Sequence, residues 1–427
     1  MARARQYPPS VDPGAPVEPS PPLGWSRHAL GDLFEVVERP VALRDDQTYQ
    51  LVNARRSRAG VAPRERLAGS QIRVRNQFLL EAGDFLISKR QIIHGACGIV
   101  PPELAGAVVS NEYAVLKPKP PLSSEYLRYL PELPYFQRTC FHSSVGVDVE
   151  KMVFKLDQWF TFHVPLPPPE EQRRIARSLF AADEAIQKTE AVIDQLEVVK
   201  RSLLANLIGP CVVTSGTRMS KTKAWHDAAI GELGRVEAGR QRNPTALGTP
   251  RPYLRVANVH DGEIRTDDVL QMPFTDAEFE RFRLQPGDIL LNEGQSLELV
   301  GRCAIYEGSP SPCAFQNSLI RFRAGPYIST HFAFHLFRLL SYEGVFSSVA
   351  TQTTSIAHLG VSRFAAIRVR VPPLSQQDRL SERLSAIDEV HRATKKGLDA
   401  VHHQRAALLD ALLTGRVRVN FPSQEAA

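Results

Sequence analysis

The chain has 427 residues, a length that predicts two to four domains. Hydrophobic residues make up 43% and charged residues 23%, as in ordinary globular proteins, and the sequence contains no run of 18 apolar residues, which excludes a transmembrane helix. The formal net charge of +6 permits nucleic acid as a partner without requiring it.

The first 24 residues are rich in Pro and Ser and lack the apolar core of a secretory signal, so we expect a disordered tail over residues 1–24. The five cysteines stand far apart and form no Cys-x-x-Cys pair. This spacing excludes a zinc finger or zinc ribbon and suits a reducing compartment, which favours a cytoplasmic protein.

From Trp25 onward the sequence consists of two copies of one module. Trp25 and Trp225 open two matched segments, Gly83-Asp84 recurs as Gly287-Asp288, and the sequence that starts at Val164 recurs from Val369. A period near 200 residues is too long for a solenoid and indicates duplication of a complete module. The predicted order is a variable unit (25–165), a shared segment (166–208), a linker (209–224), a second variable unit (225–370), a second shared segment (371–414) and a C-terminal tail (415–427).

Both shared segments are predicted to be long helices. Prolines stand just before each one, and apolar residues recur at alternating steps of three and four, as in the a and d positions of a coiled coil. The two seams also match in carrying a cation, Lys200 in the first and Arg405 in the second. Because the seams share one register, each helix is the natural partner of the other, and an antiparallel pair is expected. The alternative is that each helix packs only on its own variable unit.

The variable units are predicted to be mixed α and β. Short strands are expected at 253–259, 287–293, 303–307 and 319–324, and one amphipathic helix late in each unit, at 123–136 and 329–342. Tyr126, Leu127 and Leu130 in the first helix, and Phe332, Phe334 and Leu339 in the second, are expected in the core. The predicted fold class is therefore α+β, with two mixed α/β domains separated by two long helices that form an antiparallel coiled coil.

The motifs of common catalytic sites are missing from the sequence. There is no Gly-x4-Gly-Lys-Ser/Thr loop, and the turn at 231–234 lacks the third Gly of a dinucleotide or S-adenosylmethionine site. Asn243-Pro244 is followed by Thr245 and not by the residues of an amino-methyltransferase. His331 and His335, one helical turn apart, have the spacing of a metal pair but lack an adjacent Glu, so packing or surface roles are favoured. No catalytic residue, metal or cofactor is expected.

At this point the chain resembles the specificity subunit of type I restriction–modification systems, over about residues 25–420. The resemblance rests on Trp-x4-Leu/Ile-Gly at Trp25 and Trp225, on the two Gly-Asp-Phe/Ile-Leu segments, on Pro-Pro-x-x-x-Gln before each helix, and on the closing sequence 412–419. The first unit departs from the pattern, because its final segment, 142–168, is longer and looser than 353–373.

The resemblance implies a non-catalytic DNA-recognition subunit. The variable units would be target-recognition domains, each reading one half of a bipartite, asymmetric site in double-stranded DNA. The helices would set the spacer and dock methyltransferase subunits, to which a motor-nuclease subunit adds. The alternatives are a stand-alone DNA-modifying enzyme with drifted motifs and a coiled-coil scaffold that no longer binds DNA. The end of the first helix, 203–209, is where we expect an insertion to lengthen the spacer.

Polar loops are the candidate DNA contacts, because Arg can read guanine and Gln or Asn can read adenine through two hydrogen bonds. The alternative for each residue is a solvated loop. The candidates are Arg55, Arg56, Arg58, Lys89 and Arg90 in the first unit, and Arg240, Gln241, Arg242, Gln316, Asn317, Gln352 and Thr353 in the second.

Overall fold

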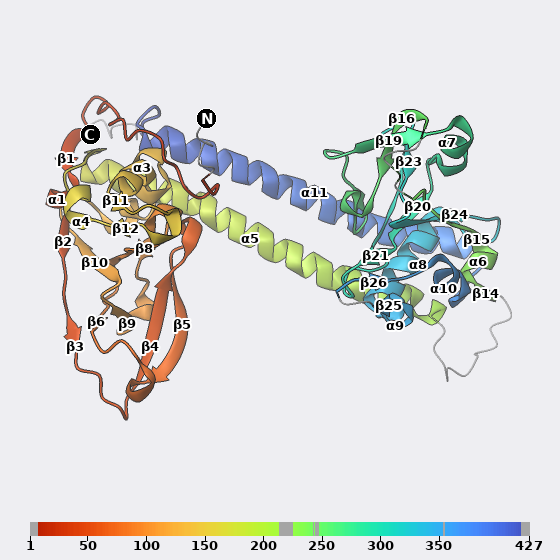
Figure 1. Ribbon diagram of the computed structural model, residues 1–427, viewed down its shortest axis with the longest axis horizontal. Helices are drawn as coiled ribbons and strands as arrows, with labels where there is room; N and C mark the ends of the chain where they lie inside the picture. Colours follow the sequence, from red (N-terminus) through yellow and green to blue (C-terminus); the bar gives the residue numbers. More distant parts are fainter. Residues whose placement is uncertain (1–6, 213–224, 242, 244–246, 353–354, 420–427) are drawn as a thin grey trace, which may run out of the picture. The chain divides into compact units, whose positions relative to one another are not determined.

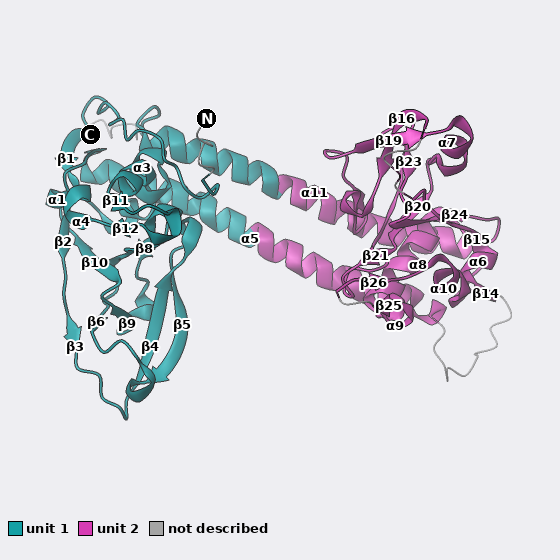
Figure 2. Cartoon of the chain, viewed as in Figure 1, with its two compact units in different colours: residues 1–188, 398–427 teal, residues 189–397 magenta. Residues whose placement is uncertain are grey.

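The computed structural model describes residues 7–212, 225–241, 243, 247–352 and 355–419. It divides into two compact units, and each unit contains one variable domain together with part of each long helix (Figure 2). Unit 1 comprises residues 1–188 and 398–427, and unit 2 comprises residues 189–397.

The two long helices are α5 (Pro169–Ile208) and α11 (Leu374–Leu413), with 40 residues each. They begin three residues later than predicted, because the residues up to Leu166 and Val371 still belong to the last strand of each domain. Both helices continue across the boundary between the units, so that 169–188 of α5 belongs to unit 1 and 189–208 to unit 2.

Within each unit the two helices pair antiparallel (Figure 1). In unit 2, Glu197 of α5 faces His391 of α11 at 3.0 Å, and Lys200 faces Asp388 at 3.7 Å, so the numbering rises on one helix as it falls on the other. In unit 1, Asp183 of α5 contacts Arg405 of α11 at 2.8 Å. Apolar seam residues of both helices join the core of each unit. The predicted antiparallel pair is therefore confirmed.

The domain of unit 1 contains a four-stranded sheet of order β2-β10-β7-β8 and a five-stranded sheet of order β3-β6-β9-β4-β5. Its first and last strands, β1 and β13, pair with each other beside α5. The strands are β1 Ser26–Ala29, β2 Phe34–Val36, β3 Pro40–Val41, β4 Thr48–Ala54, β5 Val61–Ala68, β6 Gln77–Leu79, β7 Phe85–Ser88, β8 Cys97–Ile99, β9 Val108–Ser110, β10 Tyr113–Pro118, β11 Ser144–Val145, β12 Val153–Phe154 and β13 His163–Leu166; the helices are α1 Leu30–Leu33, α2 Ser124–Leu127, α3 Pro134–His142 and α4 Leu156–Trp159.

The domain of unit 2 repeats the four-stranded sheet, as β15-β24-β20-β22, and the closing pair of first and last strands, as β14 and β27. It also contains a three-stranded sheet, β19-β16-β23, a second three-stranded sheet of order β21-β26-β25, and a two-stranded sheet, β17-β18. The strands are β14 His226–Ala229, β15 Gly234–Ala238, β16 Thr249–Leu254, β17 Val259–His260, β18 Glu263–Ile264, β19 Leu270–Phe274, β20 Ile289–Asn292, β21 Gly294–Gln295, β22 Cys303–Ile305, β23 Ala314–Phe315, β24 Leu319–Ala324, β25 Thr351–Gln352, β26 Ala357–His358 and β27 Arg368–Val371; the helices are α6 Ile230–Leu233, α7 Asp276–Phe282, α8 Thr330–Tyr342, α9 Val345–Val349 and α10 Val361–Ala366.

Two local predictions require correction. The helix expected at 123–136 is broken into α2, a 3-10 turn over 130–132 and α3, because Pro131 and Pro134 cannot donate the hydrogen bonds of a continuous helix. The strand expected at 253–259 ends at Leu254 and gives way to a 3-10 turn. The core prediction is confirmed, since all six apolar residues named for the two amphipathic helices are buried.

The expectation of a disordered tail does not hold for residues 7–24. Val11 is buried, Asp12 forms an ion pair with Arg138 at 2.9 Å, and the Ser10 hydroxyl lies 2.9 Å from Nδ1 of His94. This segment is therefore part of unit 1. The rest of the expected tail, residues 1–6, lies outside the described residues, as do most of the linker (213–224) and the end of the C-terminal tail (420–427). Over the described part of the chain, no helix is long and apolar enough to cross a membrane.

Candidate functional site

The arginine loop of unit 1 follows β4 and is held in an unusual conformation. Ser57 and Arg58 have φ angles of 57° and 61°, in the left-handed region that non-glycine residues rarely adopt. The Arg58 N–H donates to the Gly95 carbonyl at 3.0 Å, which fixes the loop against the turn at Gly95. Arg55 and Arg56 are exposed on this anchored loop, whereas Arg58 is half-buried.

The structure brings the two candidate loops of unit 1 together. Glu150 accepts from Arg56 at 2.8 Å and lies 3.3 Å from Nε2 of His94, which belongs to the turn just after Lys89 and Arg90. Lys89 donates to the Asn111 carbonyl at 2.9 Å, and Arg90 pairs with Glu112. Arg56, Lys89 and Arg90 thus each have a local acceptor that holds the side chain, and a phosphate or base would compete with that acceptor.

Arg240 in unit 2 is not a free loop residue. It is only 8% exposed, its Nε lies 3.0 Å from Glu278, and its guanidinium stacks over Phe274 at 4.9 Å. The hydrogen bond from Arg240 is the largest cause that lowers the pKa of Glu278, so the pair is ionic. Arg240 therefore stabilises the domain, and the exposed neighbour Gln241 is the better-placed candidate.

The remaining candidates of unit 2 lie along one connected edge. The Asn317 N–H donates to the Arg240 carbonyl at 3.0 Å, and the Glu293 N–H donates to the Ser318 carbonyl at 2.9 Å. Glu293 in turn precedes β21, which pairs with β26 and through it with β25, the strand that carries Gln352. Arg242 and Thr353 lie outside the described residues.

The same edge contains polar residues that the sequence analysis missed. Gln295 lies on β21, and His358 on β26 is 44% exposed and sits 3.1 Å from Glu293. A signal was present in the sequence, because Gly294-Gln295 directly follows a predicted strand and begins a polar loop.

A buried glutamine joins each domain to the helix pair in the same way. Gln172 of α5 accepts from the Ser123 N–H at 2.9 Å and donates to the carbonyls of Pro121 and Pro167, both at 2.9 Å. Gln377 of α11 makes the equivalent three bonds in unit 2, to Ser329, Tyr327 and Pro372. This is the physical role of the repeated Pro-Pro-x-x-x-Gln motif.

About three helical turns along α5 from Gln172, unit 1 has a polar cluster, named cluster 1, that consists of Tyr129, Glu132, Asp183 and Arg405. Arg405 of α11 donates to Asp183 of α5 at 2.8 Å and makes a two-point ion pair with Glu132 of the domain. The Tyr129 hydroxyl donates to Asp183 at 3.0 Å. The hydrogen bond to Glu132 is the largest cause that raises the pKa of Arg405, which therefore remains charged.

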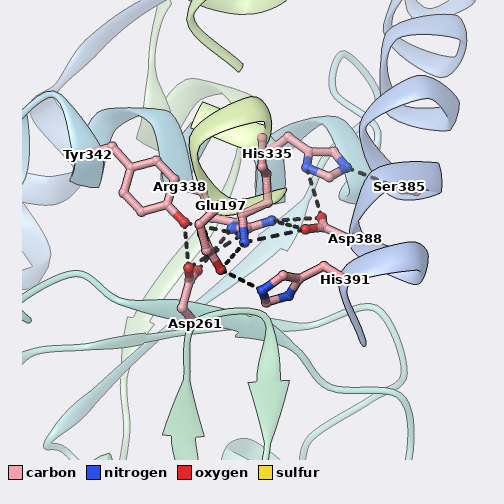
Figure 3. Close-up of polar contacts among 9 residues, drawn as sticks. Glu197, Asp261, His335, Arg338, Tyr342, Ser385, Asp388 and His391 are labelled. Atoms are coloured by element: carbon pink, nitrogen blue, oxygen red, sulfur yellow. Dashed lines mark hydrogen bonds and ion pairs between the residues drawn. The ribbon is translucent and has the colours of Figure 1, made fainter. Parts of the chain in front are cut away.

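About three helical turns along α11 from Gln377, unit 2 has cluster 2, which consists of Lys200, Asp388, Glu197, Arg338 and Asp261. Figure 3 shows how Asp388, Glu197, Arg338 and Asp261 lie in it. Arg338 of α8 is 2% exposed and donates to both Asp388 oxygens, at 2.9 and 2.7 Å, and to Asp261 at 2.9 Å. Burial opposes the charge on Arg338, but the two carboxylates outweigh it and raise its pKa. Both clusters therefore hold a charged arginine at the join between domain and helices.

The paired histidines of α8 do not share one environment. His335 is 1% exposed and its Nε2 lies 3.2 Å from the Ser385 hydroxyl, whereas His331 is exposed. Burial, aided by Arg338, His331 and Lys200 and opposed by Asp388, lowers the pKa of His335 to about 3, so the imidazole is neutral. His335 is therefore a packing histidine, as the sequence favoured.

We expect His335 to make unit 2 sensitive to acid. Its pKa in the folded state lies below the ordinary value of 6.5, so the unfolded state takes up a proton first and stability falls as the pH drops from 6.5 toward 3. Between pH 7 and pH 5 the loss is about 2 kcal/mol. Unfolding free energies of the chain and of His335→Asn should diverge over this range, with the variant less pH-dependent. The exposed control His331→Asn should retain the full slope, and equal slopes in all three proteins would contradict the assignment.

Comparison with known proteins identifies the family. The model of the type I restriction modification DNA specificity domain matches twice, at residues 22–198 and 224–401. The EcoKI specificity subunit of Escherichia coli (strain K12), a type I restriction enzyme subunit, is 19% identical over 322 residues, 73% of this chain and 69% of that protein. The MjaVIII specificity subunit of Methanocaldococcus jannaschii is 21% identical, over 93% of this chain and 94% of that protein.

Solved structures share the fold. A chain from a study of complex assembly and conformational transition of the type I R-M system superposes with a TM-score of 0.59 at 18% identity, over 93% of this chain and all of the other. The S subunit of a type I system from M. genitalium superposes with a TM-score of 0.52 at 13% identity, over 95% of this chain and 100% of that one. Both copies of the repeat are thus accounted for, and the chain belongs to the DNA specificity family of type I restriction–modification systems.

Proposed function

We propose that this chain reads a bipartite, asymmetric site in double-stranded DNA, with one recognition domain for each half. The observation that carries the proposal is that each domain is closed by pairing of its own first and last strands, β1 with β13 and β14 with β27. A domain closed in this way is a self-contained recognition module, and its two ends join the rest of the chain at one place. Two different readers on one chain can specify two different half-sites, whereas a symmetric dimer would require a palindrome.

The candidate contacts differ in chemistry between the two domains. Domain 1 offers Arg55, Arg56 and Arg90, which suit guanine and phosphate, with Arg58 and Lys89 beside them. Domain 2 offers the amides of Gln241, Asn317 and Gln352, which suit adenine, with Gln316 at the same edge. This difference supports unequal half-sites. Gln295 and His358 join the proposed contact surface of domain 2.

The proposed partners are methyltransferase subunits docked on the helices, and a motor-nuclease subunit added to them, in the cytoplasm where the DNA lies. Methyl transfer, ATP hydrolysis and strand cleavage are assigned to those partners, because this sequence has none of the motifs that such chemistry uses. The chain supplies the recognition of the site and the spacing of its two halves.

We therefore expect the purified chain to be inactive by itself. Incubated with target DNA and S-adenosylmethionine, it should transfer no methyl group above background. Addition of the methyltransferase subunits should produce methyl transfer to the two half-sites. Methyl transfer or cleavage by the chain alone would favour the alternative of a stand-alone enzyme. A complex that methylates without any sequence preference would favour the scaffold alternative.

The spacer between the half-sites should follow the length of the helix pair. The insertion site expected from the sequence, 203–209, requires correction, because Leu204 and Ile208 are fully buried in the core of unit 2. Four helix-forming residues placed after Lys188 of α5, together with four after Gly397 of α11, leave clusters 1 and 2 intact. They lengthen the pair by about 6 Å, or about two base pairs.

Mapping of methylated sites tests this expectation. The double insertion should lengthen the preferred spacer by about one or two base pairs and leave both half-sites unchanged. The same four residues inserted within 213–224 of the linker should leave the preferred spacer unchanged. A spacer that does not respond to the double insertion would show that the helices do not set it.

A further inference from the structure

The two polar clusters occupy equivalent places in the duplicated chain. With the helices matched at an offset of 205 residues, Asp183 corresponds to Asp388 and Lys200 corresponds to Arg405. Asp183 contacts Arg405 in unit 1, and Asp388 contacts Lys200 in unit 2. Each cluster therefore combines the carboxylate of one helix with the cation of the other, in the same arrangement.

One residue that each domain contributes to its cluster stands at an equivalent position, but its charge is reversed; the domain of unit 2 also contributes Asp261, which pairs with Arg338. Ser123 and Ser329 cap the helices that approach α5 and α11, and both are bound by the buried glutamines. Counting from these serines, Glu132 and Arg338 stand at the same position (132 − 123 = 338 − 329 = 9). Glu132 binds the helix cation, whereas Arg338 binds the helix carboxylate.

A second difference on the helices accounts for this reversal. In unit 2, Glu197 lies on α5 one turn before Lys200 and pairs with it at 3.1 Å, which leaves Asp388 available to Arg338. The equivalent position in unit 1, one turn before Arg405, is the exposed His402. Arg405 therefore obtains its second carboxylate from the domain, as Glu132. The carboxylate that balances the helix cation is on the helix in unit 2 and on the domain in unit 1.

We propose that Glu132 and Arg338 are positioning residues that match each recognition domain to its own end of the helix pair. A domain that brought Glu132 to cluster 2 would place three carboxylates, its own with Asp388 and Glu197, around the single buried Lys200. A wrong pairing of this kind is costly because like charges face each other away from water. Each domain is joined directly to its own long helix, since β13 ends at Leu166 and α5 begins at Pro169. The match therefore determines how stably each domain packs at that end, and which domain can replace it there. It goes beyond the proposed function and does not depend on DNA binding.

The test gives cluster 1 the charge pattern of cluster 2. The measurement is thermal unfolding of the full chain. Glu132→Arg places a second cation beside Arg405 and should lower the Tm by about 4–8 °C. His402→Glu supplies the helix carboxylate that cluster 2 has, and in combination with Glu132→Arg it should restore at least half of that loss. His402→Glu alone, at an exposed position, should change the Tm by less than about 2 °C.

The adjacent His403 provides the matched control, because it is exposed and its Nδ1 lies 2.7 Å from the carbonyl of Asp399. His403→Glu adds the same charge one residue further along and should not rescue Glu132→Arg. The reciprocal exchange in cluster 2 combines Arg338→Glu with Glu197→His and Asp261→Asn, and should be more stable than Arg338→Glu alone. Equal rescue by His402→Glu and His403→Glu, or a Tm that Glu132→Arg leaves unchanged, would overturn the proposal.

Discussion

Replacing Gln377 with leucine should lower the free energy of unfolding by about 3 kcal/mol or more, because three backbone groups lose a fully buried side-chain partner at once. The Gln377 side chain is fully buried and bonds the Ser329 N–H and the carbonyls of Tyr327 and Pro372. Leucine fills a similar volume but accepts and donates nothing, and each polar group left unpaired costs about 1–3 kcal/mol.

Calorimetry of the full chain measures this loss. The neighbouring Gln376, which is not buried, provides the control: Gln376→Leu should change stability by less than about 0.5 kcal/mol. The duplicate experiment in unit 1 compares Gln172→Leu with the exposed Gln187→Leu, and the same contrast is expected. A fall in stability of the same size in the variant and its control would refute the assignment of Gln172 and Gln377 as the links between domain and helices.

Exchange of residues 225–370 for the equivalent domain of a relative should change one half of the target and leave the other intact. The domain is closed by β14 and β27, so both junctions lie side by side at a single pair of strands. Because specific binding exceeds non-specific binding by about 10³-fold or more, methylation at the original sites should fall to background. Sites that combine the old first half with a new second half should be methylated in their place.

Genome-wide mapping of methylated bases distinguishes the outcomes. The complementary exchange of residues 25–165 should change the opposite half. A graft into 225–370 should be more stable when it retains an arginine at the position of Arg338, since Asp388 and Glu197 remain on the helices. A change in both halves after either exchange would mean that the two domains do not read the DNA independently.

Features that depend on near neighbours in the chain can be predicted from the sequence. The three- and four-residue spacing of apolar residues specified α5 and α11, because side chains one turn apart lie on one face of a helix. Comparison of the chain with itself revealed the duplication, the Pro-Pro-x-x-x-Gln motif and the matched cations Lys200 and Arg405. The same local chemistry explains one failure, since Pro131 and Pro134 were visible in the sequence and do interrupt the helix expected at 123–136.

Which charged groups pair depends on the fold of the whole domain. The aspartate of the repeated Gly-Asp motif pairs with an arginine in both units, but Asp84 binds Arg39, from earlier in the chain, and Asp288 binds Arg323, from later in it. Arg240 has the composition of a DNA-contacting loop residue, yet the fold places it between Glu278 and Phe274. Such partners are set by which strands and helices lie side by side, and that depends on burial summed over the whole domain rather than on the residues beside each arginine.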